Sequence, residues 1–280
     1  MKDHSLEVHG CHTYDATGAI SPSICLSATF RHPRFGESTG YDYGRVANPT
    51  RESLEKTVAL LERGGRSWAL SSGMAAVQLV FSLLSAGDHV LMSEDLYGGT
   101  VRLAEEVFAD YGITFEYVDV RDLALVGKRM RPETKLVFIE TPSNPMMQIS
   151  DIAALSALAH ENGALLAVDN TFLSPHFQKP LTLGADIVLH SGTKYLCGHN
   201  DVIAGFLVLK DATSAQAKRI ELLAKSAGPN LSALDSWLML RSIKTLGVRV
   251  ERQAENALAI AQWLGTLPEV TEVLYPGLAD

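Results

Sequence analysis

The stretch DIVLHSGTKYLCGHND, residues 186–201, places a lysine directly after an apolar run. The segment Ile187-Val188-Leu189 is typical of a buried strand, and it opens into small polar residues around Lys194. A lysine on a connecting loop is ordinarily a solvated surface residue. The polar residues that follow the other predicted strands favour a functional interpretation instead.

Short apolar runs alternate with helix-length segments along the middle of the chain. Apolar residues recur every three or four positions in these segments, as they do in 152–159 and 101–108. The predicted strands are 89–92, 115–118, 136–139, 165–168 and 187–189. This order predicts an α/β fold with a mostly parallel sheet, helices on both faces and ligands at the carboxyl ends of the strands.

The two flanks of the chain differ from this middle part. Residues 1–50 mix Gly, Pro, Ser and Tyr without sustained periodicity, which predicts an irregular arm that docks on another surface. Residues 51–229 form the predicted large domain. A helical pattern starts at 230 and continues with interruptions to 264, and a strand-like run follows it. We expect 230–280 to be a long linking helix and the start of a truncated C-terminal domain.

Composition indicates an ordinary globular protein that handles small molecules. The 280 residues are 46% hydrophobic and 20% charged, with a net charge of −8, so no basic footprint for nucleic acid or anionic lipid is present. The apolar runs are too short to span a bilayer, and the charged start lacks the apolar segment of a signal peptide. Three scattered cysteines favour a reducing compartment, and we expect a cytoplasmic protein.

Two other kinds of site carry less weight. The sequence HGCH at 9–12 has metal-ligand residue types without a second pair at zinc spacing, and Cys197 and His199 lack a third ligand, so no metal is predicted. A Rossmann dehydrogenase would share the alternating pattern, but no G-x-G-x-x-G motif follows a strand and opens a helix.

Polar residues gather where the predicted strands end. Parallel strands would bring them to one rim of the sheet: Tyr97, Asn144, Asp169, Ser191, Thr193 and Lys194. In addition, 70–77 reads as a strand, a tight turn and a helix, which leaves the amides of Gly73 and Met74 at a helix N-terminus that favours an anion. A lysine amine, a carboxylate, an aromatic ring and an anion site together suit pyridoxal phosphate (PLP).

Six motifs extend this interpretation to a known family. YDYGRVANPTR, SSGMAA, DLYGGT, ETPSNP, VDNTF and HSGTKYLCGHND occur in the order in which the Cys/Met-metabolism family of fold-type-I PLP enzymes has them. The sequence resembles that family over nearly its whole length. The family contains cystathionine γ-synthase, cystathionine β- and γ-lyases, methionine γ-lyase and O-acylhomoserine sulfhydrylases.

The resemblance implies a role for each matching residue. Lys194 would bond to the cofactor and act in catalysis, Asp169 would contact the pyridine nitrogen, Tyr97 would stack on the ring and Asn144 would face the ring oxygen. The phosphate would be bound by two sets of residues, of which the second reaches across from a neighbouring subunit: Gly73, Met74, Ser191 and Thr193, then Tyr43 and Arg45. The resemblance therefore implies a homo-oligomer with shared active sites, which we expect to be a dimer of dimers.

Three positions bear on the substrate. Methionine γ-lyases carry a cysteine where this sequence has Gly99, which argues against that activity, and Asp42 and Arg102 match positions that meet the distal end of the substrate in cystathionine-handling members. Asp42 also suits an ordinary loop turn, and Arg102 also suits an exposed helix surface. These positions favour a reaction on cystathionine, and they leave open whether the enzyme synthesises or cleaves it. The alternatives are methionine γ-lyase and O-acylhomoserine sulfhydrylase.

The resemblance also shows two departures. Gly44 stands where the family usually has serine, between the phosphate-binding Tyr43 and Arg45. The family's C-terminal domain supplies an arginine that clamps the substrate α-carboxylate, and the sequence stops where that domain would begin. A truncated, non-catalytic PLP-binding protein is therefore an alternative of another class.

Overall fold

The computed structural model describes residues 3–11 and 18–278. Seven strands form one sheet in the order β1-β7-β6-β5-β4-β2-β3. The strands are β1 (Arg66–Leu70), β2 (His89–Ser93), β3 (Thr114–Val118), β4 (Thr134–Glu140), β5 (Leu165–Asp169), β6 (Ile187–Ser191) and β7 (Gly205–Leu209). Neighbours from β3 to β6 are parallel, whereas β7 pairs antiparallel with both β6 and β1. The mostly parallel sheet and all five predicted strands are confirmed.

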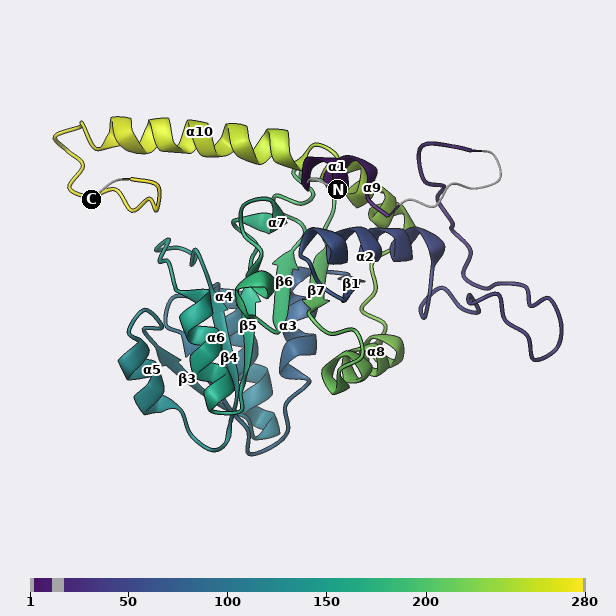
Figure 1. Cartoon of the computed structure of the whole chain (residues 1–280), viewed down its shortest axis with the longest axis horizontal. Coiled ribbons are helices and arrows are strands. Elements are labelled where there is room, and N and C mark those ends of the chain that lie inside the picture. The colour runs from purple at the N-terminus through teal and green to yellow at the C-terminus, as the bar shows by residue number, and fades with distance from the viewer. Residues whose placement is uncertain (1–2, 12–17, 279–280) are drawn as a thin grey trace.

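Helices cover both faces of this sheet (Figure 1). The longer helices are α2 (Pro49–Leu61), α3 (Gly73–Phe81), α6 (Ile152–Glu161), α8 (Ala215–Ala227), α9 (Ala233–Ile243) and α10 (Leu246–Leu264). The shorter ones are α1 (Asp3–His9), α4 (Gly98–Leu103), α5 (Leu123–Arg129) and α7 (Ser174–Phe177), with a π-helical turn at Ala104–Phe108 and 3-10 turns at Ala109–Tyr111 and Pro180–Leu183.

Alternating strand residues divide the apolar core into two clusters, one on each face of the sheet. Leu166 and Val168 of β5 pack with α2, α6, α9 and the start of α10. Ala167, between them, faces the other side and packs with residues of α3 and α8. Because successive side chains of a strand point to opposite faces, a strand that is buried on both faces reads as a continuous apolar run.

Two segments of the chain extend away from this body. Residues 18–48, called the arm below, contain no helix and only isolated bridges, and they project to one side, while the far half of α10 projects to the other (Figure 1). Helix α1 is not predicted by the sequence pattern and packs against α2 and α10.

The structure corrects two further expectations. β7 is an antiparallel strand that the alternating pattern does not predict, and the strand-like run near the C-terminus is not a strand, since 268–275 pair with no other segment of the described chain as strands do. An isolated strand leaves its backbone groups unpaired, so an apolar run is not sufficient to form one.

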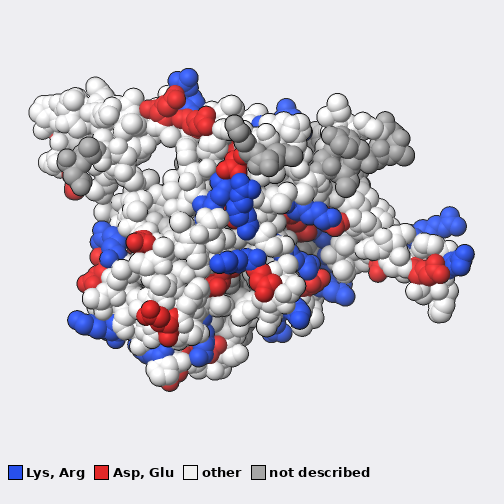
Figure 2. All heavy atoms as spheres, in the orientation of Figure 1, with Lys and Arg blue, Asp and Glu red and all other residues white. Residues whose placement is uncertain are grey.

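The surface carries charges of both signs. Figure 2 shows Lys and Arg interspersed with Asp and Glu over the face in view. Within the described residues, no helix combines the length and the apolar character that a bilayer crossing requires.

Candidate active site

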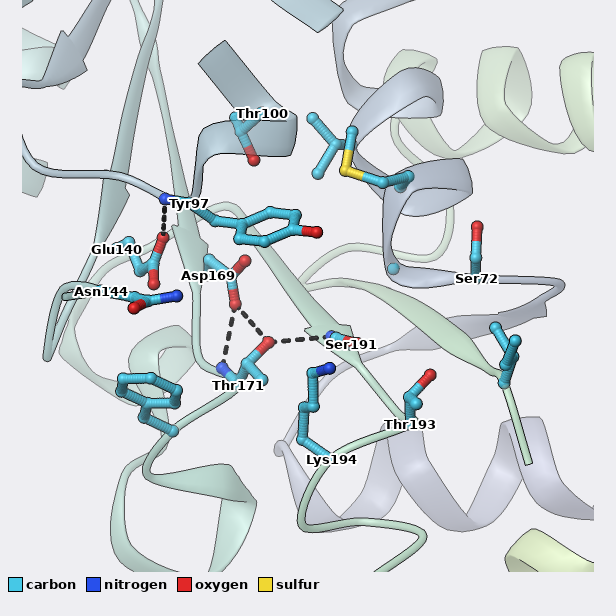
Figure 3. Close-up of a pocket in the computed structure, with 15 residues that line it drawn as sticks. Ser72, Tyr97, Thr100, Glu140, Asn144, Asp169, Thr171, Ser191, Thr193 and Lys194 are labelled. Atoms are coloured by element: carbon cyan, nitrogen blue, oxygen red, sulfur yellow. Dashed lines mark hydrogen bonds between the residues drawn. The ribbon is translucent and has the colours of Figure 1, made fainter. Parts of the chain in front are cut away.

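A cavity of about 370 Å³ lies at the carboxyl ends of the parallel strands (Figure 3). Its walls come from the ends of β4, β5 and β6, from the N-terminus of α3 and from the start of α4. The lining residues are Ser72, Gly73, Met74, Val77, Tyr97, Thr100, Glu140, Asn144, Asp169, Thr171, Phe172, Ser191, Thr193, Lys194 and Ile203. Eight predicted site residues therefore meet in one cavity: Gly73, Met74, Tyr97, Asn144, Asp169, Ser191, Thr193 and Lys194.

Lys194 reaches the cavity from a turn that follows β6. The Lys194 amide donates to the Ser191 carbonyl at 3.1 Å, and the Thr193 amide donates to the Ala204 carbonyl at 3.2 Å. Gly192 lets this turn pack closely, because a Cβ there would lie 2.6 Å from the ring of Phe206. The turn is thus fixed by backbone contacts, while the Lys194 amine points into the cavity and is accessible to a ligand.

Asp169 is held by one of its two carboxylate oxygens. Thr171 donates to Asp169 Oδ1 from its amide at 3.0 Å and from its hydroxyl at 2.5 Å, and the same hydroxyl accepts from the Ser191 amide at 2.8 Å. Burial raises the pKa of the Asp169 carboxyl, and the Thr171 hydrogen bonds and nearby His190 oppose that rise. Oδ2 makes no such bond within the described chain, so it can accept from a ligand.

A buried network lies behind this carboxylate. His190 Nε2 lies 2.6 Å from Glu62 Oε1, and the side-chain amide of Asn170 donates to the same oxygen at 2.9 Å. Glu62, Asn170 and His190 are all fully buried. Because the network joins α2 to β6 and to the residue after Asp169, it fixes the strand ends that carry the site.

Tyr97 and Glu140 meet at the opposite wall. Glu140 Oε2 accepts from the Tyr97 amide at 2.9 Å, and the half-exposed Tyr97 ring extends across the cavity (Figure 3). Glu140 pairs with Asp169 in the register of β4 and β5. Burial, and then the charge of Asp169, raises the pKa of Glu140 to about 8. Asn144 lies beside Glu140 in the same view.

The N-terminus of α3 forms the anion-binding end of the cavity. Ser72 caps this helix by accepting from the Ala75 amide at 3.1 Å, which leaves the amides of Gly73 and Met74 in the first turn for a ligand. A Cβ on Gly73 would lie 2.9 Å from Ser191, so only glycine allows α3 to approach β6 this closely. The hydroxyl groups of Ser191 and Thr193 line the same end.

These groups fit pyridoxal phosphate. The cavity presents an amine for its aldehyde, a carboxylate oxygen for its ring nitrogen, an aromatic ring for its face, and helix amides with hydroxyls for its phosphate. A simple anion could meet the Lys194 amine but would leave the Asp169 carboxylate without a ligand group to meet.

The family model of the Cys/Met metabolism PLP-dependent enzymes matches residues 4–280. The chain belongs to this family. Membership makes it an enzyme that uses pyridoxal phosphate and confirms the fold-type-I prediction.

Relatives in this family carry different reaction names at nearly the same similarity. The cystathionine gamma-lyase of Bacillus subtilis is 46% identical over all of this chain and 74% of its own length. The cystathionine gamma-synthase/O-acetylhomoserine (thiol)-lyase of the same organism is 47% identical over 94% of this chain and 70% of its own. A crystal structure of cystathionine gamma-lyase from Lactobacillus plantarum with L-serine superposes with a TM-score of 0.96, at 45% identity, over 99% of this chain and 72% of that one. Identity therefore does not distinguish synthase from lyase.

Four predicted site residues lie outside the cavity in this chain. Asp42 faces His32 Nε2 at 3.0 Å, and Tyr43 and Arg45 contact each other within the arm. Arg45 also donates to the Lys225 carbonyl, and Arg102 is exposed on α4. Their roles stay predictions.

Two lining residues carry contacts that the sequence analysis does not assign. Glu140 and Thr171 stand inside the quoted motifs ETPSNP and VDNTF, so their position at strand ends was a usable signal. The suggested metal-ligand groups do not assemble: Cys197 Sγ donates to Asp201 Oδ1 at 3.1 Å, and His199 Nδ1 lies 2.6 Å from the Cys197 carbonyl. His12 of the HGCH motif lies outside the described residues.

Proposed function

We propose that this enzyme acts on cystathionine or an O-acylhomoserine, by elimination or replacement at the β or γ carbon. The observation that carries the proposal is the accessible Lys194 amine, which points into the same cavity as the partly buried Asp169, whose Oδ2 is left for a ligand. Bound pyridoxal phosphate supplies an electron sink next to the substrate's α-carbon. The chain supplies the binding groups and the proton transfers.

Each cavity residue has a role in this proposal. Lys194 Nζ would hold the cofactor through its aldehyde carbon and would be the group that moves the proton of the substrate α-carbon. Asp169 Oδ2 pairs with the ring nitrogen, because Thr171 holds Oδ1. Tyr97 stacks on the ring and takes a proton from the incoming amine. Asn144 faces the ring oxygen.

Phosphate binding is divided between two subunits in the proposal. The amides of Gly73 and Met74 with the hydroxyls of Ser191 and Thr193 form the part within one chain. Tyr43 and Arg45 lie on the arm, outside this chain's cavity, and would complete the phosphate site of a neighbouring subunit. The arm's exposed apolar residues support docking on a partner: Ile20, Leu26 and Phe35 are 79%, 76% and 107% exposed. We infer a homo-oligomer, and a dimer of dimers suits shared sites.

Cystathionine is favoured over methionine by the wall near Tyr97. A Cβ on Gly99 would lie 2.4 Å from Tyr97 Cε1 and 3.1 Å from Met74 Sδ, so a cysteine at this position would displace the ring as it lies here. Asp42 and Arg102 are proposed to meet the second amino-acid head of the substrate. The three free cysteines support a reducing compartment, and we infer the cytoplasm.

The test combines a covalent label with a substrate panel. Borohydride reduction of the holoprotein converts the cofactor–lysine linkage into a stable amine, and peptide mass spectrometry is expected to find the label on Lys194. Turnover is then compared among cystathionine, O-acylhomoserine with cysteine, and methionine, with methionine processed least. A label on another lysine refutes the site, whereas methionine as the best substrate refutes only the substrate class.

A further inference from the structure

A second cluster of titratable side chains lies where three helices meet, apart from the cofactor cavity. His4 and Glu7 come from α1, His176 from α7 and Glu251 from α10. One donor atom from each of His4, Glu7 and His176 lies within 4.8 Å of the other two. The three helices are far apart in the sequence and share no motif.

The two imidazoles stand between two carboxylates. On the inner side, Glu7 Oε1 lies 2.8 Å from His176 Nδ1, and Glu7 Oε2 lies 3.7 Å from His4 Nδ1. On the outer side, Glu251 Oε1 lies 3.3 Å from His176 Nε2 and 3.7 Å from His4 Nε2. Both rings thus present Nδ1 to the same buried carboxylate and Nε2 to the same exposed one.

Glu7 is the buried member, only 4% exposed, and its orientation is fixed by the backbone. Its Oε2 accepts from the Gly247 amide at 3.1 Å. Gly247 also keeps a space open, because a Cβ there would lie 2.7 Å from Glu7 Oε2, 2.9 Å from His4 Nδ1 and 3.0 Å from His176 Cε1. The three side chains therefore converge on a point of α10 that has no side chain.

This donor set matches a divalent transition metal. Zn²⁺ takes imidazole nitrogen and carboxylate oxygen at about 2.0–2.2 Å, and three protein ligands with one open position are common. Neighbouring donors in such a tetrahedron are roughly 3.3–3.6 Å apart, which is within a small side-chain movement of the distances found here. A cation would also offset the charge of a buried carboxylate.

We propose that His4 Nδ1, His176 Nδ1 and Glu7 bind a divalent transition metal of the zinc class. The Glu251 carboxylate lies 3.3 and 3.7 Å from the two Nε2 atoms, so its charge favours the tautomer with Nε2–H and leaves Nδ1 free to ligate, an outer-shell role that carboxylates often have. The bound ion fastens α1 to α7 and α10. Because α7 follows the strand end that carries Asp169 and Thr171, the site braces one wall of the cofactor cavity from behind.

The site is tested on the holoprotein by metal content. Protein is stripped with a chelator, dialysed against Zn²⁺ and washed, and zinc per chain is measured by mass spectrometry. Wild type is expected to retain about one ion that His4→Ala loses. His4 is 63% exposed, so this variant keeps the fold. His160→Ala, another half-exposed histidine paired with a carboxylate, is the matched control and is expected to retain the ion.

Three more variants separate ligation from general packing. Gly247→Ala retains every donor but fills the space between them, so it is expected to lose the ion. Glu7→Gln removes one ligand at nearly constant shape and is expected to lose it as well. Glu251→Gln is expected to bind about 10- to 100-fold more weakly.

Thermal unfolding gives an independent readout. Zn²⁺ is expected to raise the unfolding midpoint of wild type and of His160→Ala, and to leave that of His4→Ala and Gly247→Ala unchanged. Equal zinc content in wild type and His4→Ala overturns the proposal. A loss of zinc in His160→Ala as large as the loss in His4→Ala overturns it as well. In that case the cluster is an ion-paired network without a metal.

Discussion

Two regions of the molecule carry the predicted site residues, and they differ in how the fold places them. The strand-end cluster consists of the predicted Tyr97, Asp169 and Lys194 together with Glu140, which was not predicted, and it lies in one cavity because parallel strands end at one edge of the sheet. The arm carries Asp42, Tyr43 and Arg45, and within the described chain these contact other arm residues, α2, α8 and the α8–α9 connection. The strand-end residues form a cavity within one chain. The arm residues would line a cofactor cavity only if a second chain provides that cavity.

The largest expected effect tests the strand-end cluster. If the Lys194 amine bonds to the cofactor and moves protons as proposed, turnover of cystathionine should fall by at least about 10²- to 10⁴-fold in Lys194→Ala. The cofactor's absorbance should also lose its sensitivity to borohydride. Lys210→Ala, an exposed lysine at the end of β7, is the control and should retain full activity. Substantial turnover by Lys194→Ala would remove the site assignment.

The next effect concerns Arg102, which lies outside the cavity. If its guanidinium meets the distal carboxylate of cystathionine, Arg102→Leu should lower kcat/KM for cystathionine by roughly 2–4 kcal/mol and barely change the rate with methionine. Arg219→Leu, an exposed arginine on α8, is the control. Equal losses with both substrates would show that Arg102 has a general structural role.

The third effect tests the arm directly. If Arg45 binds the phosphate in a neighbouring subunit as proposed, Arg45→Ala removes charge-assisted hydrogen bonds and should weaken the binding free energy of the cofactor by about 1.5–3 kcal/mol. The matched control is Arg34→Ala on the same arm, where the arginine is 81% exposed and pairs with Glu37 at 3.9 Å. Cofactor retention should also weaken on dilution as subunits separate. A monomer that binds the cofactor with wild-type affinity contradicts the shared site.

Sequence reasoning succeeded where a local pattern determines the structure. Apolar runs with polar residues at their ends located the parallel strands, and the direction of those strands then brought Asp169 and Lys194 together. It did not predict β7, because no helix separates this antiparallel strand from β6, so the alternation of strands and helices is missing there. The strand-like run near the C-terminus formed no strand, since among the described residues it is paired with no other segment.

The contacts within the cavity are harder to foresee. Glu140 and Thr171 stand in recognisable motifs, but their roles depend on the register of neighbouring strands, which fixes Glu140 beside Asp169. The cluster of His4, Glu7 and His176 joins three helices that no motif connects, and the sequence analysis looked for metal ligands at other positions. Placing the arm's residues requires a second chain, which a single sequence does not describe.

The smallest expected effect is a pH dependence confined to the strand-end cluster. The pKa of Glu140 rises from 4.5 to about 8 because the carboxyl is buried beside Asp169. A folded-state pKa above the unfolded value stabilises the fold fully below pH 4.5, and that stabilisation is lost as pH rises through about 8. With the cofactor removed, wild type should therefore lose stability relative to Glu140→Gln across this window, whereas the difference between the two proteins should stay constant below pH 4.5. Glutamine keeps an acceptor for the Tyr97 amide, so the difference reports the charge alone. Denaturant unfolding of both proteins from pH 4 to 9 measures this difference in stability.

Because both carboxyl groups belong to one chain, the difference in stability should not change with protein concentration, unlike the effect of Arg45→Ala on cofactor binding. A gap between wild type and variant that stays constant with pH would mean that Glu140 is already ionised in the folded chain.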